Sequence, residues 1–358
     1  MLSRVRETKV KKIGLITYHD VPNFGAVLQA WAMTRILRKY AKKVDLINYS
    51  PDYLKSKFSR KGWRRWVPSL GSFRRRQFCR KQLPLTRSLR TNDEVRSFVR
   101  SESYDSLVCG SDQIWMKDER QAYDMTFMLG VANSDLPRKI SYAPSCGDMV
   151  EYGTDSNVVR DQLRQFSAIS VRDVHSAEII GGLGIDNIRQ VLDPTLLVDF
   201  SNIISPRETI RLPPYIALVG PWNAQIEETA RQVSSFLKLP IVAVGTQSKE
   251  AKYLRKYVGP SEWVSHIAHA EFVVTSLFHG VMLSIRCQRP FLASPASGRQ
   301  FKIADALTKF GLGERMLCSG REMNIDDALF RLDYSSCGDR LRELSIDSWN
   351  YLDAAFND

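Results

Sequence analysis

One short segment constrains the fold more than any other part of the chain. The apolar run at 272–274 is typical of a buried parallel strand, and it stops at Thr275 and Ser276, where a helical pattern begins. Such a turn places His279 and the first free N–H groups of the helix at the carboxyl end of a sheet, where ligands of open α/β sheets and anions bind. A histidine there indicates acid–base work on a substrate bearing a phosphate or carboxylate. A capped helix followed by a core histidine is the alternative interpretation of these residues.

Strand and helix patterns alternate along most of the chain, which predicts mostly parallel sheets with helices on both faces. We expect a first Rossmann-like domain over 1–200, a linker with three prolines over 201–214 and a second Rossmann-like domain over 215–339. A last helix within 340–358 has the apolar spacing to pack back on the first domain. The predicted fold class is α/β, with two doubly wound domains facing one another across a cleft. The expected strands lie at 12–17, 44–47, 104–109, 140–143 and 168–171, then at 215–219, 241–244, 272–274 and 291–292.

Composition favours a globular cytoplasmic protein. Hydrophobic residues make up 44% and charged residues 25% of the 358 positions. No run of about 18 apolar residues occurs, and the first dozen residues are too polar for a signal peptide. The six scattered cysteines form no C-x-x-C pair, which favours reduced thiols. His266 and His269 share a helical face but lack an evident third ligand, so we expect no metal.

The net charge of +12 comes from one segment. Residues 53–92 contain 13 Lys or Arg and no Asp or Glu, and removing these 13 charges from +12 leaves the rest of the chain at −1. The same segment carries five Phe and Trp side chains. Basic residues interleaved with aromatics suit peripheral contact with an anionic membrane or an anionic glycan, or a simple solvated face. Nucleic acid is the least favoured partner for this composition.

Several segments, taken in order, resemble the polysaccharide pyruvyl transferase family. The first is TYHDVPNFGAVLQA at 17–30, similar to the family's T-Y-H-x-x-x-N-[YF]-G-A-x-L-Q-A. The others are GSDQIW at 110–115, KISYA at 139–143, SVRD at 170–173, VLDPT at 191–195 and the segment around His279. Together they extend from about residue 12 to residue 315. The resemblance implies a GT-B-like fold and transfer of a pyruvyl group from phosphoenolpyruvate to a sugar as a ketal, in surface polysaccharide synthesis.

The resemblance also implies a donor site. His279 matches the family's histidine after the C-terminal strand and is the expected acid–base residue. Arg172 follows a strand, and its planar fork suits a carboxylate or phosphate, so it is expected to be catalytic and donor-binding. Thr275, Ser276 and Gly280 are expected to contact the same anion. Phosphoenolpyruvate is a substrate here, and no cofactor is implied.

One position departs from the family pattern. Many members carry an arginine two residues before the histidine, where this chain has Leu277. One cationic clamp on the donor is therefore missing. Arg286 and Arg299 are near in sequence, although neither occupies the matching position.

The acceptor is expected at two other turns that follow strands. At the first, Asn23 is a helix cap and Gly25 a close-approach position. At the second, polar groups and an aromatic ring suit a sugar, and the alternative at both turns is local structure. The candidate acceptor residues are His19, Asn23, Gly25, Asp112, Gln113 and Trp115. Asp193, in the VLDPT segment, is expected to be structural.

Three functions compete. The leading one is a pyruvyl transferase acting on a lipid-linked or nucleotide-linked sugar, at the inner face of the membrane or in the cytoplasm. The second is a glycosyltransferase that uses a nucleotide sugar on the same two-domain frame. The third is a non-catalytic sugar- or anion-binding member of an assembly complex, which the absent arginine at Leu277 keeps open.

Overall fold

The structure is a computed structural model, and it describes residues 10–54, 70–117, 123–131, 138–221, 224–295, 300–317 and 334–357. The first half contains a parallel sheet in the order β2-β1-β3-β4, and Ile140 in β4 bridges to Ala168, just before the small β5-β6 pair. Its strands are β1 (Val10–Ile16), β2 (Ala41–Leu46), β3 (Ser106–Cys109), β4 (Arg138–Ser141), β5 (Ser170–Val171) and β6 (Arg189–Gln190). Its longer helices are α1 (Phe24–Leu37), α3 (Leu70–Gln82), α4 (Asn92–Glu102), α5 (Ser156–Leu163) and α6 (Val174–Gly182).

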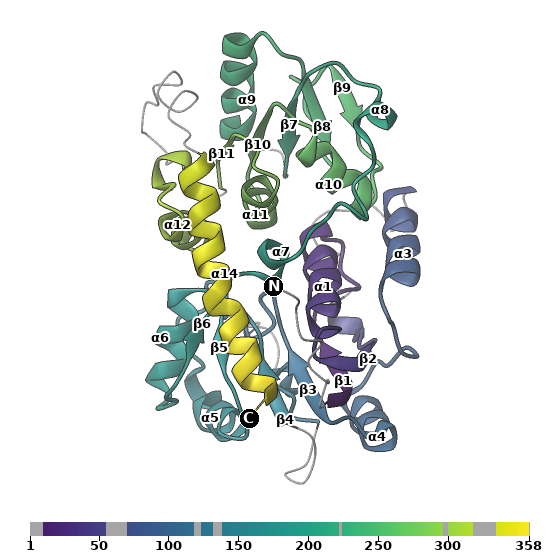
Figure 1. The fold of residues 1–358 in the computed structure, drawn as a ribbon, viewed down its shortest axis with the longest axis vertical. Coiled ribbons are helices and arrows are strands. Elements are labelled where there is room, and N and C mark those ends of the chain that lie inside the picture. The colour runs from purple at the N-terminus through teal and green to yellow at the C-terminus, as the bar shows by residue number, and fades with distance from the viewer. Residues whose placement is uncertain are drawn as a thin grey trace, which may run out of the picture.

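The second half is a five-stranded parallel sheet in the order β11-β10-β7-β8-β9. Its strands are β7 (Ile216–Val219), β8 (Ile241–Val244), β9 (Tyr253–Arg255), β10 (Phe272–Thr275) and β11 (Phe291–Ala293). The helices are α9 (Ala224–Leu237), α10 (Pro260–Ala268), α11 (Phe278–Arg286) and α12 (Gln300–Lys309). The short helices α7 (Pro194–Leu197) and α8 (Arg207–Ile210) follow β6 and precede β7 in the sequence (Figure 1). Both halves are therefore Rossmann-like, as the alternation of patterns predicted.

Helix α1 joins the two halves because it is apolar on every face. Twelve of its 14 residues are buried, and a helix that is hydrophobic all round must be covered on all sides. One side packs on the first sheet, and another packs on α7, α10 and α11. Trp31 of α1 stacks on Phe200 with ring centroids 5.2 Å apart. One hydrophobic cluster consequently runs from the first half into the second.

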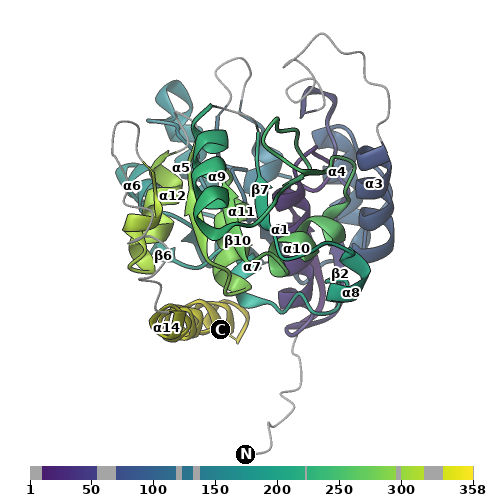
Figure 2. The ribbon, with the colours of Figure 1, turned by 90° about the horizontal axis from the view of Figure 1, so that it is seen from above.

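The C-terminal helix α14 (Tyr334–Asn357) lies against the first half and starts earlier than the expected residue 340. The Tyr351 hydroxyl donates to the Ser141 carbonyl at 2.7 Å, and Ser348 Oγ accepts from the Leu192 amide at 3.0 Å. Tyr40 on the first half donates to Asp353 at 2.8 Å. Seen from above, α14 lies outside the two sheets (Figure 2). Within the described ranges, no helix has both the length and the hydropathy needed to cross a bilayer.

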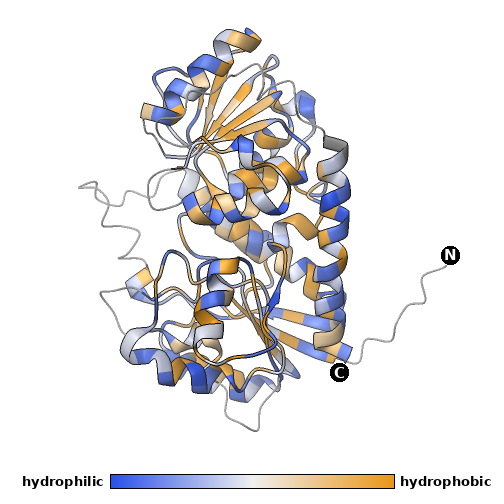
Figure 3. Ribbon diagram, turned by 90° about the vertical axis from the view of Figure 1, so that its left-hand side faces the viewer, coloured by the Kyte–Doolittle hydropathy of each residue, from blue (hydrophilic) through white to orange (hydrophobic). Residues whose placement is uncertain are grey.

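Several elements were not predicted, among them β9 and α3. Strand β9 has three residues at the edge of its sheet, too few to give a pattern. Helix α3 lies inside the basic segment, of which residues 55–69 lie outside the described residues. Its buried seam is narrow, made by Arg75, Phe78 and Cys79. Exposed helices and central strands differ in hydropathy: the strands of the second sheet are strongly hydrophobic, while most exposed helices mix hydrophobic and hydrophilic residues (Figure 3).

Candidate active site

The carboxyl ends of the central strands of both sheets meet at the junction between the halves. His279 lies in the first turn of α11, immediately after β10, as the sequence predicted. Its ring packs over the start of α1, where Asn23 caps the helix by accepting from the Gly25 and Ala26 amides. A Cβ atom on Gly25 would lie only 2.3 Å from His279 Nδ1, so only glycine fits beneath the ring.

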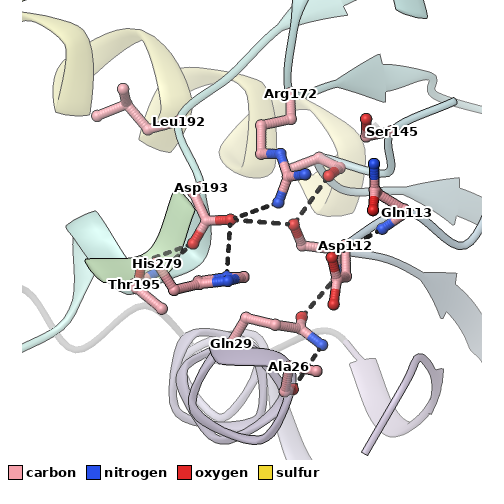
Figure 4. Close-up of polar contacts among 12 residues, drawn as sticks. Ala26, Gln29, Asp112, Gln113, Ser145, Arg172, Leu192, Asp193, Thr195 and His279 are labelled. Atoms are coloured by element: carbon pink, nitrogen blue, oxygen red, sulfur yellow. Dashed lines mark hydrogen bonds and ion pairs between the residues drawn. The ribbon is translucent and has the colours of Figure 1, made fainter. Parts of the chain in front are cut away.

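One buried carboxylate connects the catalytic candidates. Oδ2 of Asp193 lies 3.0 Å from Arg172 Nη1 and 3.6 Å from His279 Nε2 (Figure 4). Oδ1 accepts from the Thr195 amide at 3.0 Å and from its hydroxyl at 2.6 Å, which caps α7. Asp193 was expected to be structural. The sequence did not reveal that it lies between Arg172 and His279.

The charges of this cluster support one another. Burial alone would raise the pKa of Asp193, but His279 and Arg172 hold that pKa well below its usual range. Burial would likewise lower the pKa of Arg172. The negative charges of Asp193, Asp112 and Asp173 outweigh this effect and raise that pKa. Asp193 is therefore ionised and Arg172 positively charged at neutral pH. Arg172 also lies over the Phe278 ring, with its guanidinium carbon 4.2 Å from the ring centroid.

A small pocket of about 60 Å³ opens beside this cluster. Four of the predicted site residues besides Arg172 contribute to its wall, and Lys302 of α12 is an addition that no sequence pattern indicated. The remaining lining is apolar. The full lining consists of Asn23, Asp112, Gln113, Arg172, Trp263, Leu277, Phe278, His279 and Lys302.

A hydrogen-bonded network fixes the first half of the site. Gln29 of α1 accepts from the Ser111 amide at 3.1 Å and donates to Thr17, Tyr18 and Ala26. Ser111 Oγ donates to the Ala143 carbonyl at 2.8 Å and lies 3.5 Å from Asp193 Oδ2. Gln29 thus ties the turn after β1 to the turn after β3. Figure 4 shows Gln29 on α1 below Asp112 and Asp193.

Two predicted acceptor residues lie elsewhere. The Trp115 side chain is fully buried and donates from Nε1 to the Phe127 carbonyl at 3.2 Å, so no ring face is open to a sugar. His19 is 2% exposed, and its ring nitrogens lie 3.1 Å from the Thr17 carbonyl and 2.9 Å from Asn48 Oδ1. Both side chains are buried in this structure, and acceptor binding by them stays a prediction.

The donor residues of the β10–α11 turn mostly serve the turn itself. Thr275 is fully buried and accepts from the Leu277 amide at 3.1 Å. The close approach at Gly280 is to Thr275, whose Oγ1 would lie 2.1 Å from an added Cβ, and not to an open space. Ser276 is buried against Gly220, and its hydroxyl has no hydrogen-bond partner within the described part of the chain.

Arg286, one of the two arginines suggested to replace the one missing at Leu277, does not line the pocket. Arg286 lies at the far end of α11 and donates to the Val198 carbonyl at 2.6 Å. Arg299 lies outside the described residues. Lys302, three residues after Arg299 in the sequence, lines the pocket together with Arg172.

Known structures share the fold of this chain. The forosaminyltransferase SpnP of spinosyn synthesis superposes with a TM-score of 0.56 at 11% identity, over 98% of this chain and 100% of that one. UGT73P12 of Glycyrrhiza uralensis, solved with glycyrrhetinic acid 3-O-monoglucuronide, gives a TM-score of 0.52 at 11% identity, over 97% and 95% of the two chains. These similarities assign the GT-B fold.

No curated protein sequence matches this chain. The family model of polysaccharide pyruvyl transferases matches residues 23–294, which include Asn23, Asp112, Arg172, Asp193 and His279. The matched region runs from the cap of α1 to just past β11 and so contains the second sheet and every strand of the first except β1. The chain therefore belongs to the polysaccharide pyruvyl transferase family.

Proposed function

We propose that this protein transfers a pyruvyl group from phosphoenolpyruvate to two hydroxyl groups of a sugar, forming a ketal and releasing phosphate. The observation that carries the proposal is that Arg172 and His279, from the two halves, meet at Asp193 beside a pocket that also holds Lys302. Two cations and a histidine suit a small donor with a carboxylate and a phosphate. Family membership supports the same reaction.

The reaction requires one proton to be added to the methylene carbon of phosphoenolpyruvate. His279 supplies this proton, and the adjacent carbon then accepts a sugar hydroxyl, which loses its own proton to the imidazole. Phosphate leaves with the electrons of its C–O bond, and a second sugar hydroxyl attacks the same carbon. Two hydroxyl protons are released in total, and they balance the proton gained by carbon and the one taken up by phosphate.

Asp193 would position His279 during this sequence. The carboxylate is 1% exposed and lies 3.6 Å from His279 Nε2, so its negative charge is a nearby partner for the imidazolium form. Arg172 and Lys302 would then hold the carboxylate and phosphate of the donor. We assign to Lys302 the role of the cation that is missing at Leu277.

The pocket is small for this task. Ligand pockets usually have volumes of about 300–1,000 Å³, whereas the one beside His279 measures about 60 Å³. Lys302 is half-buried on α12, at the rim of this pocket and of a second small one beside Arg172.

The function is tested by incubating the protein with phosphoenolpyruvate and a galactose-containing acceptor and detecting the pyruvate ketal by NMR. We expect His279→Ala to reduce turnover by about 10²–10⁴-fold, the usual contribution of a general acid–base group. His175→Ala is the matched control, because His175 bonds the Met149 carbonyl at 2.7 Å on the first half and does not line the pocket. More than a tenth of wild-type turnover in His279→Ala would exclude the acid–base role.

Donor binding is tested separately by calorimetry with phosphoenolpyruvate. Arg172→Lys keeps the charge but loses the planar fork, and Lys302→Gln loses the charge, so both should weaken binding. Unchanged donor affinity in both variants would assign these residues to structure. Sugar transfer from a nucleotide sugar would favour a glycosyltransferase, and neither reaction would favour a non-catalytic binding protein.

The acceptor is proposed to be carried on a lipid or nucleotide, with the basic segment 53–92 holding the protein at an anionic membrane. Part of that charge is already paired: Arg75 contacts Asp20 at 3.1 Å, and Arg74 contacts Glu262 at 2.5 Å. Leu70 and Phe73 on α3, however, are 51% and 56% exposed. Vesicle sedimentation at two salt concentrations tests the contact, because binding that depends on anionic lipid should weaken as salt rises. Equal partitioning onto neutral and anionic vesicles would exclude it.

A further inference from the structure

A groove of about 830 Å³ lies apart from the His279 pocket. It lies where α3 of the first half meets α8, the end of β9 and α10 (Figure 1). Glu262 and His266 of α10 line this groove, whereas Trp263 of the same helix lines the His279 pocket. The two sites are thus separated by little more than a helix width, about 10 Å.

The groove carries uncompensated positive charge. Arg211, Arg255 and Lys256 line it, and none of them forms an ion pair with a carboxylate within the described ranges. Glu262, the acidic residue of the lining, is already engaged by Arg74 at 2.5 Å and by the Gly259 amide at 2.6 Å. Three cations that line one hollow, none of them paired with a carboxylate within the described ranges, favour an anion with more than one negative charge.

The same groove exposes apolar surface. Leu70, Leu254 and Tyr257 all line it and are 51%, 53% and 46% exposed. Large apolar side chains that gather at the wall of one hollow indicate a ligand with an apolar or aromatic part. A volume of about 830 Å³ is within the usual range for such ligands.

We propose that this groove binds a diphosphate together with the apolar or aromatic group attached to it, namely the carrier end of the acceptor. The proposal rests on the function above, in which the acceptor sugar is carried on a lipid or a nucleotide. Arg211 and Arg255 bind the phosphates through their planar forks, and Leu254 and Tyr257 contact the attached group. The sugar then extends around α10 towards His279.

The test is calorimetry of the full chain with three probes: inorganic pyrophosphate, farnesyl diphosphate and uridine diphosphate. We expect one of the two substituted diphosphates to bind about tenfold or more tightly than pyrophosphate, and which one does identifies a lipid or a nucleotide carrier. Arg211→Gln/Arg255→Gln should weaken that binding by about tenfold or more, since bonds to charged groups contribute strongly. The control variant Arg189→Gln/Arg231→Gln removes two exposed arginines outside the groove and should leave diphosphate binding unchanged.

A second variant separates a fold defect from a binding defect. Leu254→Gln should weaken the preferred substituted diphosphate and leave pyrophosphate unchanged. Equal affinity for all three probes, no binding of any probe, or binding that survives Arg211→Gln/Arg255→Gln would each overturn the proposal. Calorimetry measures binding without turnover. An absence of pyruvyl transfer and an absence of diphosphate binding in the groove can therefore be told apart.

Discussion

Replacing Gly25 by alanine places a methyl group against the ring of His279. The new Cβ would lie 2.3 Å from Nδ1, 2.4 Å from Cγ and 2.6 Å from Cβ of His279, whereas ordinary van der Waals contact starts at 3.4 Å. The imidazole therefore has to move by about 1 Å. A misplacement of 1 Å at a reacting group costs about 10²-fold in rate. We expect the kcat of Gly25→Ala to fall by this amount.

The effect on stability should be much smaller. Overpacking costs about 1–3 kcal/mol, and alanine recovers about 0.5–1 kcal/mol of helix propensity in α1, so the net loss is about 1–2 kcal/mol. Thermal unfolding measures this loss, and the ketal assay measures the rate. The matched control is Gly181→Ala in α6, where no atom lies within 4 Å of an added Cβ. Wild-type kcat in a folded Gly25→Ala protein would refute the placement of His279 over α1.

Three further outcomes are expected. Asp193→Asn leaves Arg172 and His279 without their buried negative partner and should cost about 3–5 kcal/mol by urea unfolding at pH 7. Because the pKa of Asp193 is depressed in the fold, its contribution is complete above about pH 4 and lost as pH falls further, so the gap between wild type and variant should narrow in acid. Burial, aided by Arg255, lowers the pKa of His266 to about 4, so the stability of the wild type should fall as the pH drops from about 6.5 to 4. His266→Gln should remove this pH dependence. An unchanged pH dependence in the variant would mean that other groups cause it. Trp115→Ala should cost about 3–5 kcal/mol without raising the acceptor KM of the folded protein; a raised KM would return Trp115 to the acceptor site.

Local patterns predicted the parts of the site that depend on neighbouring residues. The apolar run of β10 followed by Thr275 and Ser276 located the turn that carries His279, and Asn23 was identified as a helix cap. These features are visible because a strand end and a helix start are adjacent in sequence.

Features that depend on distant residues were not visible. Asp193 is 21 residues from Arg172 and far from His279, so their meeting at one carboxylate is a property of the packed halves. Lys302 enters the pocket from α12 for the same reason. Trp115 follows a strand and resembles a surface platform, and only Phe127, from a distant turn, shows that it is a core residue.

The apolar helix α1 has a consequence for how the protein unfolds. Because one hydrophobic cluster includes side chains from α1, α10 and α11, separating the halves would expose much of the interior of both. The protein should behave as one cooperative unit, although its chain forms two separate parallel sheets. Proteolysis between the sheets would then yield two unstable fragments, and a ligand that contacts Arg172 and His279 together would protect the entire chain against heat.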